Sequence, residues 1–377
     1  MVFVMKFTID RADLLRSLNH VHSVVERRNT IPILANVLLR AEKDSLSLTT
    51  TDMDLEIVES VSAHASAPGA TTVPAHTLYD IVRKLPDAST VEFTTGAGET
   101  TLLVKAGKST FRLGCLPTED FPKMGSTEKF SYSFSVPAAD LRTLIDRTRF
   151  AISNEETRYY LNGIYLHAAE SDGVSVLRAV ATDGHRLARF EMPLPEGAKD
   201  MPGVIIPRKA INEIRKLIDE AGDSIEIGLS DNKLKFTFDH VTMTTKLIDG
   251  TFPDYERVIP KNNDKFLEVN PAAFASAVDR VSTISSEKSR AVKLTLNGKT
   301  MTLSANSPDS GSASEEIEVR FNSGAMEIGF NSAYLMDVTR QIEGEGCRIS
   351  LSDPASPTII QDIADNSSLY VLMPMRV

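Results

Sequence analysis

Phe7-Thr-Ile-Asp-Arg-Ala-Asp-Leu-Leu15 decides the fold of this chain, because its pattern returns as Phe134-Ser-Val-Pro-Ala-Ala-Asp-Leu-Arg142 and as Leu267-Glu-Val-Asn-Pro-Ala-Ala-Phe-Ala275. In each copy a few strand-like residues meet a helix cap or a proline, and an amphipathic helix follows. These capping positions are Asp10, Pro137 and Asn270-Pro271. Equivalent residues lie 127 and 133 residues apart, and such even spacing predicts three domains of one design.

A second unit of strand, break and helix lies midway through each copy, at residues 72–82, 205–214 and 328–338. Each domain is therefore expected to contain two half-domains of strand, helix and further strands. Alternating runs between the helices, such as residues 45–50 and 233–238, predict antiparallel strands with one solvated face. The expected fold class is α+β.

Polar, turn-rich segments at residues 125–129 and 260–265 mark the linkers between the copies. They divide the chain into domains at residues 1–129, 130–260 and 261–377. The length of 377 residues, with 42% apolar and 24% charged residues, agrees with a globular protein of two or three domains.

The cysteines and the N-terminus bear on the compartment. Cys115 and Cys347 are the only cysteines, which argues against a disulfide framework and a cysteine-based zinc site. The sequence has neither a secretion signal nor eighteen consecutive apolar residues. A cytoplasmic protein is expected.

The charge distribution qualifies an overall net charge of −10, which alone argues against nucleic acid. Six helical segments are expected, at residues 11–28, 76–85, 139–149, 208–220, 272–290 and 331–343. Together they carry +5, so the rest of the chain carries −15. If the helices line one surface, that surface is a weakly cationic track suited to sequence-independent phosphate contacts. For any single helix, basic residues on a solvated face are the favoured explanation of the charge.

Eight stretches in order along the chain carry a family resemblance. They are Met5-Lys-Phe-Thr8, Thr30-Ile-Pro-Ile-Leu34, Gly69-Ala-Thr-Thr-Val-Pro74, Arg158-Tyr-Tyr-Leu-Asn-Gly163, Ala181-Thr-Asp-Gly-His-Arg-Leu-Ala188, Val204-Ile-Ile-Pro-Arg-Lys209, Asp249-Gly-Thr-Phe-Pro-Asp-Tyr255 and Tyr370-Val-Leu-Met-Pro-Met-Arg376. With them the chain resembles the beta subunit of bacterial DNA polymerase III, the DNA sliding clamp and processivity factor.

The resemblance implies a head-to-tail homodimer ring of three-domain protomers, with antiparallel sheets outside and helices lining a central channel around duplex DNA. It implies a non-enzymatic protein without a cofactor, whose partners are double-stranded DNA, the replicative polymerase, the clamp loader, and repair and translesion polymerases that bind through short peptide motifs. A membrane is not among the expected partners.

The resemblance also places three sets of site residues. For DNA contact it implies Arg28, Arg158, Tyr159, Tyr160, Arg208 and Lys209. For a partner-peptide pocket it implies Leu161, Thr182, Gly184, His185, Arg186, Leu187, Pro253, Val258, Val371, Met373, Pro374 and Met375. For the dimer interface it implies Phe111, Leu113, Thr283 and Ile284.

Some of these positions depart from the family or have a plainer explanation. Glu155, His76 and Thr77 stand where amide or basic residues are usual, which predicts a weaker DNA track, and Thr283 replaces a larger apolar residue. Met1-Val-Phe-Val4 precedes the family's usual start and is either a short extension or a misassigned start. Phe111 and Leu113 also suit an ordinary core, since alternation places both on one face. Residues 182–187 also suit a strand, an Asp-Gly turn and a strand. Methionines in the pocket suit a groove that accepts several related peptides, with Arg186 fixing their course.

An enzyme is the alternative function. Gly107-Lys108-Ser109 imitates the end of a phosphate-binding loop, but Leu102 stands where that loop needs glycine and a strand-like run follows. The histidines and cysteines have no zinc-ligand spacing. Asp183 and His185 remain as an acid–base pair on duplicated domains, without an accompanying nucleophile.

Overall fold

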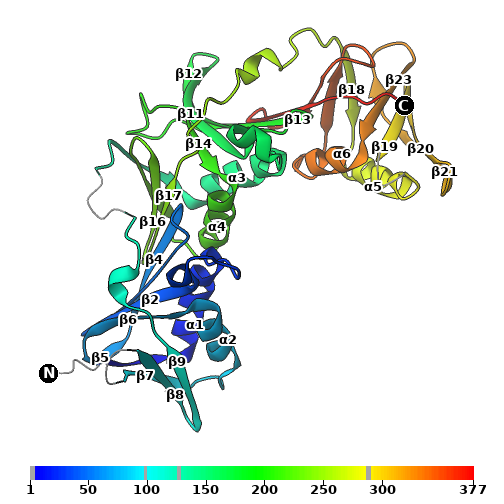
Figure 1. The fold of residues 1–377 in the computed structure, drawn as a ribbon. Helices are drawn as coiled ribbons and strands as arrows, with labels where there is room; N and C mark the ends of the chain where they lie inside the picture. The colour runs from blue at the N-terminus through cyan, green and yellow to red at the C-terminus, as the bar shows by residue number, and fades with distance from the viewer. Residues whose placement is uncertain (1–4, 97–99, 125–128, 286–289) are drawn as a thin grey trace. The chain divides into compact units, whose positions relative to one another are not determined.

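The computed structural model describes residues 5–96, 100–124, 129–285 and 290–377, which form 26 strands and six α-helices (Figure 1). The Met1–Val4 extension and most of the 125–129 linker lie outside the described residues. The helices are α1 Arg11–Val21, α2 Ala75–Lys84, α3 Ala138–Thr148, α4 Arg208–Ile218, α5 Pro271–Ser282 and α6 Ser332–Thr339. No helix within the described residues is both long and apolar enough to span a membrane.

The chain packs as two compact units. The first comprises Met1–Arg142, Pro195–Ala198 and Lys209–Leu247, and the second comprises Thr143–Leu194, Lys199–Arg208 and Ile248–Val377. Each unit contains two sheets, and every pairing among the described strands is antiparallel, as the alternating sequence pattern predicts.

The first unit contains a five-stranded and an eight-stranded sheet. In spatial order the former is β5 His64–Ala67, β1 Lys6–Asp10, β7 Thr90–Thr95, β8 Thr101–Ala106 and β9 Ser109–Gly114. The latter is β10 Tyr132–Pro137, β15 Ser224–Leu229, β16 Lys233–Phe238, β17 Val241–Lys246, β4 Leu55–Ser62, β3 Ser45–Thr51, β2 Asn36–Glu42 and β6 Gly69–Pro74. Helix α1 packs on β3 and β4 and beside α2.

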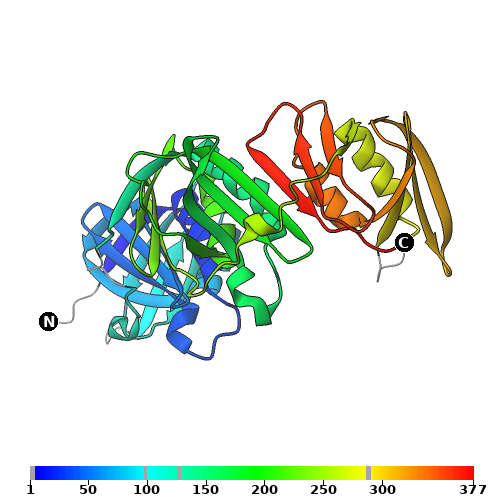
Figure 2. The ribbon, with the colours of Figure 1, turned by 90° about the horizontal axis from the view of Figure 1, so that it is seen from above.

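The second unit contains a nine-stranded and a four-stranded sheet. In spatial order the former is β14 Val204–Pro207, β11 Gly163–Ser171, β12 Val174–Thr182, β13 Arg186–Pro193, β26 Ser368–Leu372, β25 Thr358–Asp362, β24 Cys347–Leu351, β18 Lys265–Val269 and β22 Arg320–Phe321. The latter is β21 Gly311–Glu318, β20 Thr300–Ser307, β19 Ala291–Asn297 and β23 Met326–Asn331. Helices α5 and α6 lie side by side against this smaller sheet (Figures 1 and 2).

Two strand pairings join sheets across the expected domains. β4 pairs with β17, and β13 pairs with β26, each over five residue pairs. Backbone hydrogen bonds therefore continue from the first expected domain into the second, and from the second into the third. This continuity explains why the three repeats pack as two units.

The helix starts follow the capping residues only in part. Asn270 accepts a hydrogen bond from the Ala273 amide at 2.9 Å with Pro271 in the first turn, so this predicted cap is confirmed. Asp10 occupies the N-cap of α1, but its side chain makes no capping bond. The capping prediction for Asp10 was therefore wrong in its chemistry and right in its position.

The helices end earlier than the sequence predicted, and this changes the charge count. They hold eleven basic and seven acidic side chains, an excess of four rather than five. Helices α3 and α5 are neutral, whereas α4 has four basic residues and one acidic residue. The predicted positive sign is thus confirmed, but it is concentrated in α4.

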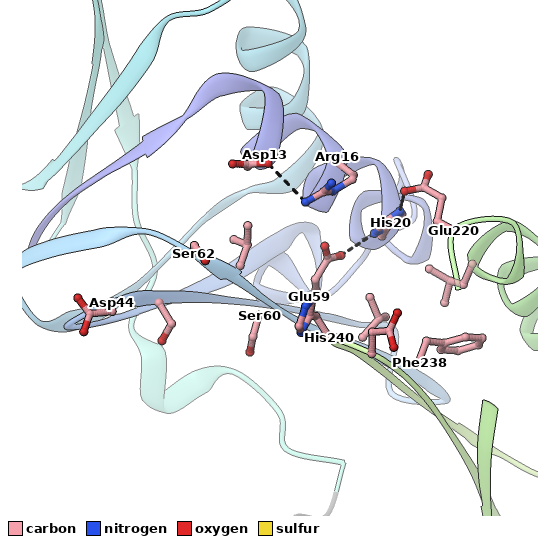
Figure 3. Close-up of a pocket in the computed structure, with 15 residues that line it drawn as sticks. Asp13, Arg16, His20, Asp44, Glu59, Ser60, Ser62, Glu220, Phe238 and His240 are labelled. Atoms are coloured by element: carbon pink, nitrogen blue, oxygen red, sulfur yellow. Dashed lines mark hydrogen bonds and ion pairs between the residues drawn. The ribbon is translucent and has the colours of Figure 1, made fainter. Parts of the chain in front are cut away.

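A histidine between two carboxylates links α1 to the strands and to the end of α4. His20 Nδ1 lies 2.8 Å from Glu59 Oε2, and its Nε2 lies 3.0 Å from Glu220 Oε2, beside a hollow of about 550 Å³ (Figure 3). Ser17 donates to the other oxygen of Glu59 at 2.7 Å. Burial lowers the pKa of His20, but hydrogen bonding and charge from Glu59 and Glu220 outweigh burial and raise it.

We expect the His20 contacts to stabilise the first unit more at low pH. Because the pKa is raised on folding, their contribution is complete below the unfolded value of about 6.5 and is lost as pH rises through the folded value. His20→Gln should lower the free energy of unfolding by about 1–3 kcal/mol at pH 6 and by less at pH 8.5, since it leaves the buried Glu59 poorly paired. Urea unfolding of both proteins across this range measures the difference, and a pH-independent gap would contradict the assignment.

Candidate functional site

The turn between β12 and β13 is closed by its own side chains. Thr182 Oγ1 donates to the Arg186 carbonyl at 2.7 Å and accepts from the Gly184 amide at 3.1 Å. Asp183 Oδ1 accepts from the amides of His185 and Arg186 at 2.9 and 3.0 Å. Gly184 has a φ of +87°, which suits glycine. The structure confirms the interpretation of residues 182–187 as a strand, an Asp-Gly turn and a strand. Hydrogen bonds within the turn fix its conformation.

Arg186 ties this turn to α6 and to the end of α3. Its guanidinium donates to Asp183 at 3.1 Å, to Asp337 at 2.5 Å and to the Phe150 carbonyl at 2.6 Å. It also lies 4.3 Å from the ring centroid of Tyr334. The guanidinium is thus occupied by protein groups, which differs from the expectation that it fixes the course of a peptide.

The C-terminal segment runs from β26 past this turn. The Met373 amide donates to the His185 carbonyl at 2.9 Å, and the Met375 amide donates to the Gly329 carbonyl at 2.8 Å. A Cβ on Gly329 would lie 2.3 Å from a methyl of Val377. Residues 375–377 therefore lie against β23, and the absence of a side chain at position 329 leaves room for them.

A buried apolar cluster includes residues of the strands β12, β13 and β26. It consists of Leu161, Val180, Leu187, Ile205, Phe252, Tyr255, Leu369 and Val371. Three residues predicted for the partner pocket, Leu161, Leu187 and Val371, belong to it. Two others, Val258 and Met373, are 53% and 40% exposed. The predicted set thus has a buried base and an exposed rim, to which Pro253, Gly184 and His185 also belong, and its remaining members are half-buried, namely Thr182, Arg186, Pro374 and Met375.

The sequence prediction missed several residues that hold this site. Arg178 is buried and donates to the Tyr255 hydroxyl at 2.8 Å, to Glu256 at 2.8 Å and to Glu191 at 2.7 Å. These bonds fix the short helical turn Tyr255–Arg257, which precedes the exposed Val258. Tyr255 lies within one of the stretches that resemble the family, so the sequence could have indicated its importance. Arg178 lies outside these stretches, and no sequence pattern singled it out.

Four residues predicted to contact DNA lie in the second unit. Arg208 donates to the Asn154 side chain and the Ser153 carbonyl, and Arg158 pairs with Glu155 at 3.1 Å. Tyr159 is 53% exposed and meets Tyr160 edge to face at 5.7 Å.

The Arg158 segment also contacts the turn described above. A Cβ on Gly184 would lie 2.8 Å from Arg158 Nη1. The structure therefore brings Arg158 against the β12–β13 turn, and glycine at position 184 leaves room for the guanidinium.

Arg28 and Lys209, also predicted to contact DNA, lie in the first unit. Arg28 is exposed and follows the 3₁₀ turn His22–Val24 rather than lying in α1. Lys209 Nζ pairs with Asp52 and lies 3.4 Å from Glu26. Burial lowers the pKa of Lys209, but hydrogen bonding and charge from Asp52 and Glu26 raise it overall, so the ammonium stays charged.

The residues predicted for a dimer interface lie at strand and helix ends. Phe111 is half-buried and Leu113 is 8% exposed, both on β9, which is an edge of the five-stranded sheet. Thr283 is the exposed C-cap of α5, and Ile284 follows it.

The proposed acid–base pair has other contacts. The Asp183 carboxylate binds two backbone amides and Arg186, while the exposed His185 ring lies over Tyr334 with centroids 6.2 Å apart. Among the described residues, no group of three or more His, Cys, Asp or Glu side chains has the geometry to hold a metal ion. Gly107, in the phosphate-loop imitation, forms the tight turn between β8 and β9.

Three family models match consecutive parts of the chain. They describe the N-terminal, central and C-terminal domains of the DNA polymerase III beta subunit and match residues 5–125, 135–254 and 256–376. The Beta sliding clamp of Caulobacter vibrioides (strain NA1000 / CB15N) is 52% identical over 373 residues, covering 99% of this chain and 100% of the relative. That of Escherichia coli (strain K12) is 38% identical over 374 residues, with the same coverage.

Solved structures of sliding clamps have the same fold as this chain. The DnaN sliding clamp (DNA polymerase III subunit beta) from Bartonella birtlesii, bound to griselimycin, has a TM-score of 0.96 at 50% identity and covers 99% of this chain and 100% of its own. The Caulobacter crescentus beta sliding clamp has a TM-score of 0.97 at 52% identity, with full coverage of both chains. The chain therefore has the three-domain clamp fold and belongs to the DNA polymerase III beta subunit family.

Proposed function

We propose that this protein is the DNA sliding clamp of its replication machinery, which encircles duplex DNA and tethers the replicative polymerase to it. The observation that carries this proposal is the unbroken succession of three beta-subunit domain matches over residues 5–376. The enzyme alternative with Asp183 and His185 has no support from the comparisons, and the protein acts without catalysis or a cofactor. We also propose the domain limits 1–129, 130–260 and 261–377.

The head-to-tail dimer is supported by two complementary edge strands. β9 ends one sheet and carries Phe111, Leu113 and the exposed Arg112. β21 ends another and carries three glutamates and Ile317. Pairing β9 of one protomer with β21 of its partner would satisfy both edges and match opposite charges. A repeated heterologous contact that closes after two copies makes a ring.

DNA contact is supported by the basic excess of the helices, which is largest in α4. We propose that Arg28, Arg158, Tyr159, Tyr160, Arg208 and Lys209 meet the phosphate backbone. Lys209 is held by Asp52, so it would meet phosphate only by exchanging that partner. Such contacts are weak and independent of base sequence, as sliding requires.

Partner binding is proposed at the surface made by the β12–β13 turn, Val258 and residues 373–375. Its buried base is rigid, and the exposed Met373 and Val258 provide apolar contacts for short peptide motifs. We propose that Arg186 acts here as a tie between the turn and α6, rather than as a ligand for the peptide. The clamp loader and the repair and translesion polymerases would share this surface with the replicative polymerase.

Retention on DNA of different topology tests the function. A protein loaded by a clamp loader onto nicked circular DNA should co-elute with the circle, and linearisation should release it. Light scattering should give a mass near twice 41.3 kDa. Equal retention on linear and circular DNA would refute encirclement, and a turnover of small molecules lost in His185→Ala would favour the enzyme instead.

We expect Arg28→Ala combined with Lys209→Ala to reduce loading and its salt dependence. Each lost phosphate contact lowers the slope of log K against log salt by about 0.9 for duplex DNA, so the pair should lower it by up to about 1.8. Measuring loading from 50 to 200 mM salt gives the slope. Lys43→Ala with Lys199→Ala, two exposed lysines elsewhere, is the matched control. An unchanged slope in the test variant would remove these residues from the DNA contact.

A further inference from the structure

The second unit contains a hollow of about 640 Å³ away from the residues discussed above. It is lined by β18, β22 and β24 and by the turn between β19 and β20 that holds Gly298 and Lys299. On β18, Leu267 and Val269 are buried, so Phe266 and Glu268 lie on the opposite, outward face. The hollow therefore lies on the solvated face of the nine-stranded sheet.

An aromatic side chain is held in the open at this hollow. Phe266 is 41% exposed. Its amide donates to Asn322 Oδ1 at 2.6 Å, and its carbonyl accepts from the Asn322 amide at 3.2 Å. The backbone beneath the ring is thus fixed on both sides. An exposed aromatic ring on a hydrogen-bonded backbone gives apolar contact area to a ligand at a low cost in backbone entropy.

Three cationic side chains line the hollow together with Phe266, and one of the three has an acidic partner among the described residues. Arg348 donates to Glu268 at 2.9 Å. Lys299 and Arg320 have no acidic partner among the residues that the structure describes. The hollow thus carries two uncompensated positive charges in a chain whose net charge is −10. Its charge complements an anion.

The edge strand beside the hollow cannot add another strand here. The Phe321 amide donates to the Gly298 carbonyl and the Val319 amide donates to the Lys299 carbonyl, both at 2.9 Å. The amides of Val319 and Phe321, at and just before β22, are therefore already bonded and cannot pair with a peptide strand. A ligand would therefore be recognised through side chains.

We propose that this hollow binds a short acidic peptide segment of a partner protein, with an apolar side chain over Phe266 and carboxylates at Lys299 and Arg320. Arginine and lysine with one aromatic ring suit one or two carboxylates beside an apolar group. A nucleic acid would need a longer cationic track or several stacking rings. The proposal is independent of the surface at residues 373–375 and goes beyond the proposed function.

Fluorescence anisotropy of a labelled peptide, Asp-Glu-Leu-Phe-Asp-Glu, titrated with the full-length protein tests the proposal. Lys299→Glu with Arg320→Glu should raise its Kd at least tenfold, and so should Phe266→Ser. The matched control, Lys43→Glu with Lys199→Glu, makes the same change in net charge at exposed lysines elsewhere and should leave the Kd unchanged. Circular dichroism of each variant checks that the fold persists.

Four outcomes would overturn the proposal. The first is equal binding of a peptide with lysines in place of its acidic residues, and the second is unchanged binding by the charge-reversed variant. The third is tighter binding of a ten-residue thymidine oligonucleotide at the same residues, which would assign the hollow to nucleic acid. A protein lacking residues 373–377 should bind the peptide normally, which separates this hollow from the proposed partner surface. Absence of any peptide binding also refutes the proposal.

Discussion

Deleting residues 373–377 should abolish stimulation of the polymerase while leaving a folded dimer. The deletion removes the exposed Met373 and the segment whose amides bind the carbonyls of His185 and Gly329. The shortened chain still ends with β26, whose five residues pair with β13 and are retained. Loss of one apolar hot-spot side chain costs about 2 kcal/mol or more, so partner-peptide affinity should fall about 30-fold or further. Primer extension on a primed circle, with clamp loader and polymerase, measures the loss.

A point variant tests whether the position of residues 375–377 matters, without removing them. Gly329→Ala places a methyl where Val377 now lies, so it should displace residues 375–377 and weaken peptide binding without deleting anything. Gly324→Ala is the matched control, because a Cβ there meets no atom within 4 Å. If the deleted protein still stimulates the polymerase fully, the partner surface has been placed wrongly.

The repeats made the fold predictable, because each copy shows the same order of strand, cap and helix. Helix α4 begins at Arg208, as expected, and the predicted strand at residues 233–238 is β16. The end of α1 could not be predicted. The chain leaves the helix after Val21, and the Val25 carbonyl accepts from His76, which is 51 residues away. Such a long-range contact leaves no local pattern in the sequence.

The candidate site could be predicted where a compact stretch of sequence carries it. Residues 373–377 and the β12–β13 turn each lie within a few consecutive residues, and the family resemblance predicts both as parts of the partner surface. The ties of Arg186 to Phe150 and Asp337 span 36 and 151 residues, and the pairing of Lys209 with Asp52 spans 157. The contacts with Asp337 and Asp52 depend on how neighbouring domains join, and the contact with Phe150 depends on how β13 packs on the turn that follows α3. Neither periodicity nor composition reveals them. These contacts underlie our proposal that Arg186 supports the β12–β13 turn rather than binding the peptide.

Phe111→Asp should convert the dimer into a monomer. Phe111 is half-buried on the edge strand β9, so the protomer tolerates a polar residue there better than at Leu113, which is 8% exposed. In the proposed interface the new carboxylate would be desolvated opposite the glutamates of β21. An unpaired buried charge costs several kcal/mol, and each 1.4 kcal/mol weakens association tenfold. Light scattering at micromolar concentration should give a mass near 41.3 kDa.

The same variant should also lose retention on circular DNA, because a monomer cannot close around a duplex. Ser66→Asp is the matched control, since it adds the same charge at the opposite edge strand, β5, of the same sheet. It should remain a dimer and stay on the circle. Dimeric Phe111→Asp protein would show that β9 lies outside the interface. A second outcome would contradict the dimeric ring as the cause of retention. In that outcome the Phe111→Asp protein is a monomer, yet it stays on circular DNA and leaves linear DNA.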